Sequence, residues 1–298
     1  MLSSKSCDAF LAVAETGSFE DAAQRLYITA SAVTLRVQSL EKALGQILLL
    51  RERPCRVTQS GQKLLEHLQH QRLREQNLLQ QFAGQTQAHE FHQFSIASNA
   101  DSLDTWLLKV LQKPLIEYKI ALKLSLDDQT QTHQLLETGL VNACISTEST
   151  AMKGCEVHYL GQMTYRMVAT PAFAQQWFQH GVHRDSLSHA PAIIFNHKDL
   201  LHHQLILQLF GLNQSRYPHY FIPSSHAFLD AVHLGLGFGL LPEYQIDEDL
   251  KTGKLIEIMP QARSEMQLYW HHWKQQSALL HQLTNVLLLE AHTQMNGN

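Results

Sequence analysis

The chain has 298 residues, of which 44% are hydrophobic and 17% are charged. This length is sufficient for two or three compact units, and the composition is ordinary for a globular protein and excludes general disorder. No apolar run approaches the ~20 residues of a membrane-spanning helix. Asp8 and Glu15 interrupt the apolar positions near the start, which is unlike a secretory signal. We therefore expect a cytoplasmic protein that has no membrane partner.

The net charge of −4 conceals a basic segment near the start of the chain. Between Ala22 and Lys63 there are seven basic and two acidic residues, whereas the chain from Phe91 onward is acidic on balance. Positive charge confined to one segment of an acidic chain indicates that this segment binds a polyanion while the rest has another role.

Three amphipathic helices are predicted within the first 45 residues. Gly17 ends the first, Ser18 caps the second, and Thr29 and Gly45 delimit the third. The second and third helices, joined by a tight turn, predict a helix-turn-helix. The third has small and polar outward positions that suit the major groove of DNA, and its arginine can reach a base edge or a phosphate. The candidate DNA-binding residues on it are Thr29, Ala30, Ser31, Thr34, Leu35 and Arg36.

The stretch "ILLLRERPCRVTQSG" predicts two short strands joined by a turn at Pro54, which together form a wing. Arg51, Arg53 and Arg56 on this wing suit phosphate oxygens beside the groove. We therefore predict an all-α winged helix-turn-helix domain over residues 1–59, whose partner is double-stranded operator DNA. The alternative is a solvated three-helix bundle with incidental arginines.

Residues 60–90 predict a linker helix followed by a hinge at "GQTQAHE". One side of the helix carries a thin apolar seam in an otherwise polar sequence, which favours a partner helix. Pairing with a second copy would give a homodimer or a homotetramer, and symmetric dimers suit paired DNA half-sites. The alternative is packing on its own domain. The seam residues are Leu64, Leu65, Leu68, Leu73, Leu78, Leu79 and Phe82.

Alternating strand and helix patterns begin after Glu90 and predict a βαβαβ unit with a parallel sheet. We expect an α/β domain over residues 91–298, with one subdomain at 91–166 and 268–298 and a second at 167–267. The chain would cross between them near residues 165–170 and again near 265–270. A cleft between two such subdomains is a natural ligand site, because ligands of open α/β sheets bind beyond the carboxyl ends of strands.

The stretch "SNADSLDTW" joins a predicted strand to a predicted helix and supports a small-molecule site. A helix start offers free N–H groups and partial positive charge for an α-carboxylate. Asp101 or Asp128 would accept a ligand ammonium, although Asp101 has the alternative role of a helix cap. The candidate residues from this region and the neighbouring strand ends are Ser98, Asn99, Asp101, Ser102, Asp128 and Thr147.

These residues resemble the LysR-type transcriptional regulators over essentially the whole chain. The spacing "AA..L.I..SAV..RV..LE..LG...L.R......T..G" matches the winged helix-turn-helix of that family. "GLGFGLLP" at 235–242 is similar to its late helix-to-strand signature, although these glycines have the alternative role of close helix–sheet packing. The resemblance implies a sequence-specific regulator whose effector domain is periplasmic-binding-protein-like.

The stretches "NADSL.TWLL", "PSS.AF" and "LYWH" resemble the arginine- and lysine-responsive branch, the ArgP and LysG group. This resemblance implies a basic amino acid as effector and an amino-acid exporter gene as a target. Leu35 stands where the family often has a polar Gln, so readout there is expected to be weak or apolar. Asn196 and His226 stand where the branch commonly has acidic residues, and they complete the candidate effector set. A different small-molecule effector is the alternative.

Two other functional classes fit the sequence less well. An enzyme is disfavoured because no GxSxG, Walker loop or HExxH motif is present, and we predict no catalytic residues. The four cysteines form no CxxC pair, and the 19 histidines form no ligand set with clustered carboxylates, so we expect no metal and no cofactor. A solute-binding protein is disfavoured by the basic segment and the missing export signal.

Overall fold

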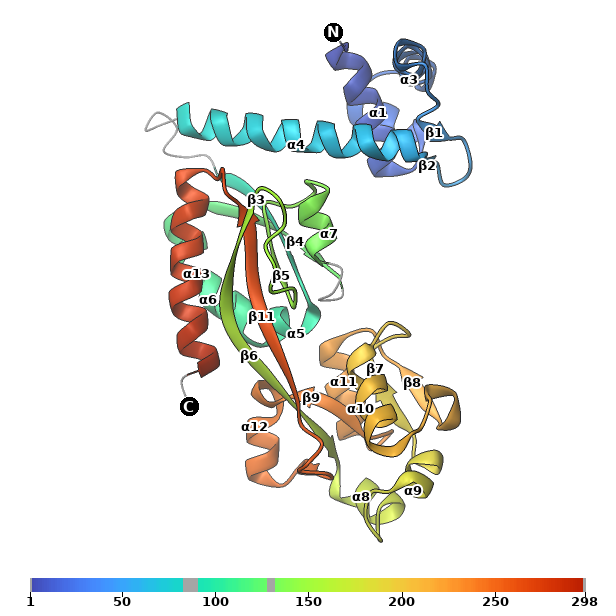
Figure 1. Ribbon diagram of the computed structural model, residues 1–298, viewed down its shortest axis with the longest axis vertical. Coiled ribbons are helices and arrows are strands. Elements are labelled where there is room, and N and C mark those ends of the chain that lie inside the picture. Colours follow the sequence, from blue (N-terminus) through green and yellow to red (C-terminus); the bar gives the residue numbers. More distant parts are fainter. Residues whose placement is uncertain (1, 83–90, 128–131, 297–298) are drawn as a thin grey trace. The chain divides into compact units, whose positions relative to one another are not determined.

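The computed structural model describes residues 2–82, 91–127 and 132–296 and divides the chain into two units. Unit 1 contains Met1–Gln87 and Glu137–Leu140, and unit 2 contains Ala88–Leu136 and Val141–Asn298 (Figure 1). The predicted hinge at 84–90 lies outside the described residues. Within the described ranges, no helix has the length and apolar character needed to cross a membrane.

Unit 1 begins with the three predicted helices, and local capping explains where they start and stop. The Ser18 hydroxyl accepts a hydrogen bond from the Asp21 N–H at 3.2 Å, and the Thr29 hydroxyl accepts one from the Ala32 N–H at 3.2 Å. Gly45 takes the left-handed conformation that ends the third helix. The helices are α1 (Ser4–Thr16), α2 (Phe19–Leu26) and α3 (Ala30–Leu44).

The predicted wing is present as β1 (Leu49–Leu50) and β2 (Arg56–Val57), which pair antiparallel. The Cys55 N–H donates to the Gly17 carbonyl oxygen at 2.8 Å and ties the wing to the turn between α1 and α2. The description of this domain as all-α is therefore too narrow, because the backbone groups of the wing find their partners in a two-stranded sheet.

Helix α4 (Gln59–Phe82) contributes its first turns to the core of unit 1. Leu68 is buried in the cluster around Phe10 and Val37, and Leu64 and Leu65 pack against it. Leu68 therefore packs on its own domain, which was the alternative given for the seam, while pairing of the partly buried Leu64 and Leu65 with a second copy stays a prediction. Apolar side chains one turn apart reach the nearest apolar surface, which here is α1 and α3.

The second half of α4 has a different environment. The side chain of Leu78 is 51% exposed. The side chains of Leu73, Leu79 and Phe82 lie outside the described part of the structure. Self-pairing therefore stays a prediction for this half of the helix as well.

Unit 2 is built on one mixed sheet with strand order β10-β6-β11-β5-β3-β4, and β9 pairs with β6. The predicted βαβαβ grammar is confirmed at its start, since β3 pairs in parallel with both β4 and β5. The strands are β3 (His92–Ser98), β4 (Ile120–Leu126), β5 (Ala143–Ser146), β6 (Cys155–Ala169), β9 (Gly239–Pro242), β10 (Ile256–Glu257) and β11 (Ser264–Trp273).

Strands β6 and β11 are the long elements of the sheet and run from one end of unit 2 to the other (Figure 1). They pair antiparallel from Ser264 opposite Tyr165 to Trp273 opposite Cys155. The register shifts between Leu268 and Tyr269, which marks a bulge or irregularity in the ladder. The predicted crossings near 165–170 and 265–270 both lie on this strand pair. The last residues of β6 were predicted as a strand from "YRMVAT", but residues 155–164 were not, because polar residues interrupt the pattern.

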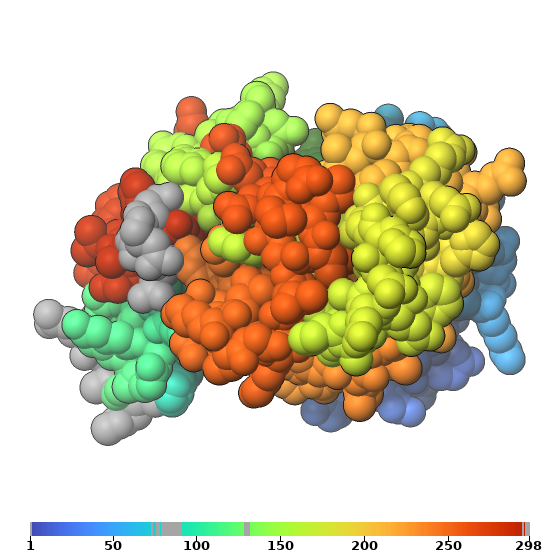
Figure 2. Space-filling view, turned by 90° about the horizontal axis from the view of Figure 1, so that it is seen from below, coloured from blue at the N-terminus to red at the C-terminus, as the bar shows by residue number. Residues whose placement is uncertain are grey.

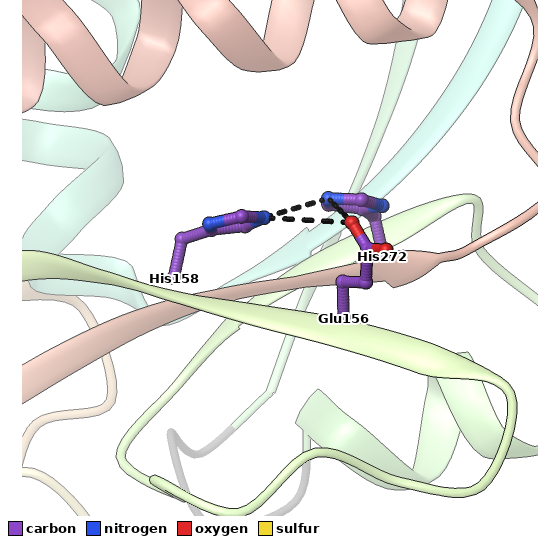
Figure 3. Close-up of side chains that lie close together, drawn as sticks. All are labelled: Glu156, His158 and His272. Atoms are coloured by element: carbon purple, nitrogen blue, oxygen red, sulfur yellow. Dashed lines mark hydrogen bonds and ion pairs between the residues drawn. The ribbon is translucent and has the colours of Figure 1, made fainter.

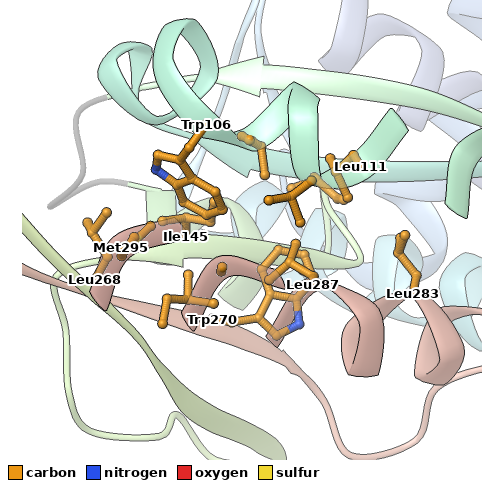
Figure 4. Packing of buried hydrophobic residues seen from close by; sticks show 14 of the residues in the cluster. Trp106, Leu111, Ile145, Leu268, Trp270, Leu283, Leu287 and Met295 are labelled. Carbon is orange, nitrogen blue, oxygen red and sulfur yellow. The ribbon is translucent and has the colours of Figure 1, made fainter. Parts of the chain in front are cut away.

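One face of the sheet is covered by helices that enclose the largest apolar cluster of unit 2 (Figure 4). Trp106 and Trp270 are buried there with Leu283 and Leu287. The Trp270 indole N–H donates to the Thr284 hydroxyl at 3.1 Å, which satisfies its one polar atom. The helices of this end are α5 (Ala100–Ser102), the π-helical turn η1 (Leu103–Leu107), α6 (Leu108–Glu117), α7 (Thr132–Glu137) and α13 (Ala278–Asn296).

The other end of unit 2 has separate apolar clusters. Residues of α8 and α9 lie against the segment after β10, seen as yellow-green beside orange in Figure 2. Helices α9 and α12 were not predicted. The elements are α8 (Pro171–Trp177), α9 (Arg184–His189), β7 (Ala192–Ile194), α10 (Leu200–Phe210), η2 (Gln214–Arg216), β8 (His219–Phe221), α11 (Ser225–His233) and α12 (Glu243–Thr252).

The glycines of "GLGFGLLP" have a packing role. A Cβ added at Gly239 would lie 2.5 Å from Cε1 of Phe228, which belongs to α11. Contacts that short do not occur, so α11 can pack on β9 only where the strand has no side chain. The packing alternative for this signature is therefore confirmed at Gly239.

Candidate functional site

The outward face of α3 presents the predicted DNA-reading positions. The side chain of Leu35 is 66% exposed on this face. Ser31 is exposed beside Thr29, with 3.0 Å between the two hydroxyl oxygens. The Thr34 hydroxyl donates to the Ala30 carbonyl oxygen at 2.9 Å, so its methyl group is left to face outward or sideways.

Four arginines, one on α3 and three on the wing, have guanidinium groups that are available to bind an anion. Arg51, Arg53 and Arg56 on the wing are exposed, and Arg36 on α3 is half-buried. None of the four forms an ion pair within residues 2–82 or with the other described ranges, whereas Arg25 pairs with Glu15 at 2.5 Å. Unpaired guanidinium groups retain their full attraction for phosphate oxygens.

A cavity of about 460 Å³ lies in unit 2 between the α5 end and the α11 end. This volume is in the range of small-molecule sites. Asn99, Asp101 and Asn196 of the predicted effector set line it. The complete lining is Asn99, Ala100, Asp101, Asp104, Leu126, Asp127, Tyr165, Phe195, Asn196, Asp199, Leu201, His202, Pro223, Ser224, Ser225, Phe228, Leu240, Leu241, Pro242 and Met266.

Asp101 is an acid of the lining that is held by two hydroxyl groups from other elements. Its carboxylate accepts hydrogen bonds from the Tyr165 hydroxyl at 2.7 Å and from the Ser225 hydroxyl at 2.8 Å. Burial raises the pKa of Asp101, and the two hydrogen bonds oppose that rise. The residue before the helix is Asn99, and Asp101 accepts no capping bond. The helix-cap alternative for Asp101 is therefore wrong.

Three further carboxylates line the cavity, at Asp104, Asp127 and Asp199. Asp199 also begins α10, since its carboxylate accepts from the His202 N–H at 3.2 Å. No lysine or arginine is present among the described lining residues. Four acidic side chains around one cavity whose described lining contains no lysine or arginine create a negative potential that favours a cationic ligand.

His202 is a buried lining residue with unsatisfied hydrogen-bonding groups. It is 1% exposed, and neither ring nitrogen has a hydrogen-bond partner among the described residues. Burial, with smaller contributions from His219 and His203, lowers the pKa of His202 to about 3, so the imidazole is neutral near neutral pH. The Asn99 amide is likewise buried without a partner among the described residues. Such groups at a cavity wall are available to a ligand.

The remaining predicted effector residues lie elsewhere. Ser98 and Ser102 are buried, and their hydroxyls donate to the Asn99 carbonyl oxygen at 3.2 Å and toward the Met163 sulfur at 3.9 Å. Thr147 and His226 are not part of the cavity lining, and the side chain of His226 is 83% exposed. Asp128 lies outside the described residues.

Sequence reasoning missed several of the lining residues for different reasons. Asp104 follows Asp101 at the i,i+3 spacing that places two side chains on one helix face, and this signal was available. Ser225 lies within the "PSS.AF" stretch that carried the branch resemblance. Asp199 and His202 are distant in sequence from Asp101, and no local pattern connects them.

Comparison with known families covers both units. Residues 5–62 match the bacterial regulatory helix-turn-helix protein model of the lysR family. Residues 87–291 match the LysR substrate binding domain. The first match covers the helices predicted to bind DNA, and the second covers most of the unit that contains the cavity.

Individual relatives extend this similarity along the whole chain. The HTH-type transcriptional regulator ArgP of Proteus mirabilis (strain HI4320) is 40% identical over 278 residues, which are 93% of this chain and 92% of that protein. The crystal structure of ArgP from Mycobacterium tuberculosis has a TM-score of 0.80 and 32% identity, with 98% of both chains covered. Full-length LysG from Corynebacterium glutamicum with bound effector Arg has a TM-score of 0.68 and 31% identity, over 96% of this chain and 97% of that one.

Proposed function

Because the chain belongs to the LysR family of bacterial helix-turn-helix regulators, in its ArgP and LysG branch, we propose that it controls transcription in response to a basic amino acid. In this proposal α3 and the wing bind operator DNA, and the cavity of unit 2 binds the effector. The observation that carries the effector class is the acidic cavity lining.

The charges of the lining match those of lysine or arginine. Asp101, Asp104, Asp127 and Asp199 offset two cationic groups, the α-ammonium and the side-chain cation, with no competing lysine or arginine in the described lining. Ion pairs inside a cavity are screened less by water and salt than pairs at the surface. The corynebacterial LysG structure was determined with bound arginine, which supports the same chemical class here.

We assign the ends of the ligand from the hydrogen-bonding groups. The unpartnered Asn99 amide and the first N–H groups of the helical run from Ala100 suit the α-carboxylate. Asp101 is adjacent and suits the α-ammonium. Asp104 and Asp127 then serve the distal cation, a role that the sequence had left without a candidate at Asn196 and His226.

DNA binding is assigned to the residues predicted from the sequence. Ser31, Leu35 and Arg36 on α3 read base edges, with Thr29, Ala30 and Thr34 supporting the helix start. Arg51, Arg53 and Arg56 contact phosphates, because their guanidinium groups are exposed and carry no ion pair within the described ranges. By its branch resemblance, we assign an amino-acid exporter gene as a target, and a homodimer as the DNA-binding form.

Calorimetry on the full chain tests the effector assignment. Lysine and arginine should bind, and norleucine, which has the lysine carbon skeleton without the ammonium, should bind at least about tenfold more weakly. Asp101→Asn should weaken lysine binding by about 1.5–3 kcal/mol, the range for hydrogen bonds to charged groups. Asp230→Asn is the matched control, because this carboxylate is exposed and lies outside the cavity lining.

Two outcomes would contradict this assignment. If neither basic amino acid releases heat while operator binding is intact, the effector belongs to another chemical class. If Asp101→Asn binds lysine as the wild type does, the cavity is not the effector site. A gel shift at two salt concentrations separates a regulator from an enzyme or solute-binding protein, since only DNA-phosphate binding has a steep salt slope.

A further inference from the structure

A second group of polar side chains lies on the β6–β11 ladder outside the ligand cavity (Figure 3). Glu156 and His158 are two positions apart on β6 and therefore share one face of the sheet. His272 on β11 lies opposite Glu156 in the register and projects from the same face. None of the three lines the cavity.

The three side chains bring one potential ligand atom each into a small volume. Nε2 of His158 and Nε2 of His272 are 3.2 Å apart, and Oε2 of Glu156 is 3.9 Å from each. A tetrahedral ion with bonds of about 2.0–2.2 Å separates its ligand atoms by roughly 3.3–3.5 Å. The spacing fits after a small movement of Glu156, whose side chain is 49% exposed and free to adjust.

The tautomer of His272 leaves its lone pair directed at the other two residues. Nδ1 of His272 lies 2.9 Å from the Trp273 carbonyl oxygen. A carbonyl only accepts, so Nδ1 carries the proton and Nε2 does not. A backbone carbonyl bound to the outer ring nitrogen is the arrangement that orients metal-bound imidazoles. His272 is 1% exposed, which holds the ring in place.

A hydrogen bond between the two imidazoles does not include the Glu156 carboxylate. If His158 donates from Nε2 to Nε2 of His272, the Glu156 carboxylate at 3.9 Å from each nitrogen accepts no hydrogen bond from either. A cation at the centre of the triangle contacts all three atoms at once. Two imidazoles and one carboxylate are a ligand set for divalent zinc, cobalt or nickel.

We propose that Glu156, His158 and His272 form a binding site for one divalent transition-metal ion that joins β6 to β11. Three protein ligands leave a coordination position for water. The sequence predicted no metal site because the two histidines are 114 positions apart, and only the antiparallel register brings them together.

Titration of the full chain, without an affinity tag, with Zn²⁺ and Co²⁺ tests this proposal. Calorimetry should detect a zinc site that His158→Asn and Glu156→Gln each weaken by at least about tenfold. Co²⁺ should give the visible absorption of a four-coordinate site, and the two variants should reduce it. His233→Asn is the matched control, because His233 pairs with one carboxylate, Asp249, at 2.8 Å and has no second imidazole.

The folding of the variants is checked by thermal unfolding with chelator present, where both should match the wild type. Glu156→Gln is the safer variant, since its side chain is half-exposed. Zinc should then raise the melting temperature of the wild type and of His233→Asn, but not of the two site variants. Equal zinc affinity and stoichiometry in wild type and both site variants, or no zinc binding by the wild type, would overturn the proposal.

Discussion

Buried polar side chains at the cavity wall give unit 2 its most sensitive single residues. His202 lies among Tyr217 and Phe238, with ring centroids 6.0 and 5.8 Å away, and has no polar partner within the described residues. An imidazole in such surroundings is stable only in its neutral form. The residue therefore links the stability of the unit to pH.

We expect His202→Phe to make the unfolding free energy less sensitive to acid. The pKa of His202 is about 3 in the folded chain and 6.5 in the unfolded one, so the unfolded state binds more protons between these values. Stability is complete above pH 6.5 and is lost as the pH falls. Between about pH 7.5 and pH 5 the loss from this group is about 2 kcal/mol. Urea unfolding at both pH values measures it.

The control for this expectation is His226→Asn, because the His226 side chain is 83% exposed. It should retain the acid sensitivity of the wild type. Burial also lowers the pKa of His271 and His272, so a part of the acid sensitivity remains in His202→Phe. A slope in His202→Phe equal to that of the wild type would show that His202 is hydrated.

Substitutions of Leu35 and Arg53, on the surface proposed to bind DNA, should weaken DNA binding in different ways. Leu35→Ala removes apolar contact with a base, such as a thymine methyl, and should weaken operator binding by about 1 kcal/mol without changing binding to random duplex. Arg53→Ala removes a phosphate contact and should weaken both, with the salt slope reduced by about one. Gel shifts at several salt concentrations separate the two, and Leu35→Met should preserve specificity.

At the scale of elements, local signals predicted unit 1 well. Ser18, Thr29 and Gly45 act within a few residues, and capping chemistry alone places the starts of α2 and α3 and the end of α3. Elements of unit 2 such as β6 depend instead on pairing with segments that are distant in the sequence. The start of β6 has no strong alternation, and its extended form depends on β11, which lies more than a hundred positions later.

In the candidate site, too, local sequence features predicted one part and long-range contacts determine the other. Asp101 was predicted because it follows a strand end, which is a local feature. Its neighbours at Tyr165 and Ser225 reach it only through the sheet and through α11. Asp199 and His202 enter the cavity from α10, so the negative charge that favours a cation is a property of the folded unit. No sequence pattern within ten residues of Asp101 brings these acidic residues together.

The junction of the wing with α4 should be intolerant of a larger residue at Gly61. An added Cβ would lie 2.1 Å from the Leu48 carbonyl oxygen, which is backbone and cannot move aside. We expect Gly61→Ala to destabilise unit 1 by at least about 1–3 kcal/mol, the usual cost of overpacking. Thermal unfolding and operator binding report the loss.

Gln59→Ala is the matched control for this junction, because it shortens an exposed side chain in the same first turn of α4. It should unfold as the wild type does. Effector binding by Gly61→Ala should be retained, since Gly61 is not part of unit 2. A fully stable Gly61→Ala would mean that the wing shifts relative to α4 at little cost.

At the scale of the whole molecule, the residues proposed to bind DNA and the cavity proposed to bind the effector belong to different units, each with its own apolar core. A regulator of this construction depends on association as well as on coupling along the chain. When one subunit of a dimer binds a half-site, the second subunit is held close to the other half-site. The dimer therefore binds paired half-sites far more tightly than a single copy does. The second half of α4, where Leu78 is exposed, is the surface that we predict for that association.

We expect Leu78→Asp to dissociate the dimer and to weaken binding to a two-half-site operator by about a hundredfold. The reason is that an aspartate in an apolar interface has no partner for its charge. Light scattering measures the mass, and Arg74→Ala on the same exposed stretch is the control. Lysine affinity should not change. An unchanged mass would place the interface outside α4.

The continuous β6–β11 ladder has a mechanical consequence for ligand response. A hydrogen-bonded strand pair resists stretching and sliding, since either motion breaks many bonds at once. If the proposed effector closes the cavity, we therefore expect the movement to be a twist of this ladder. The irregular register at Leu268 and Tyr269 is its compliant point. Ligand binding would then change the angle between the two ends of the unit.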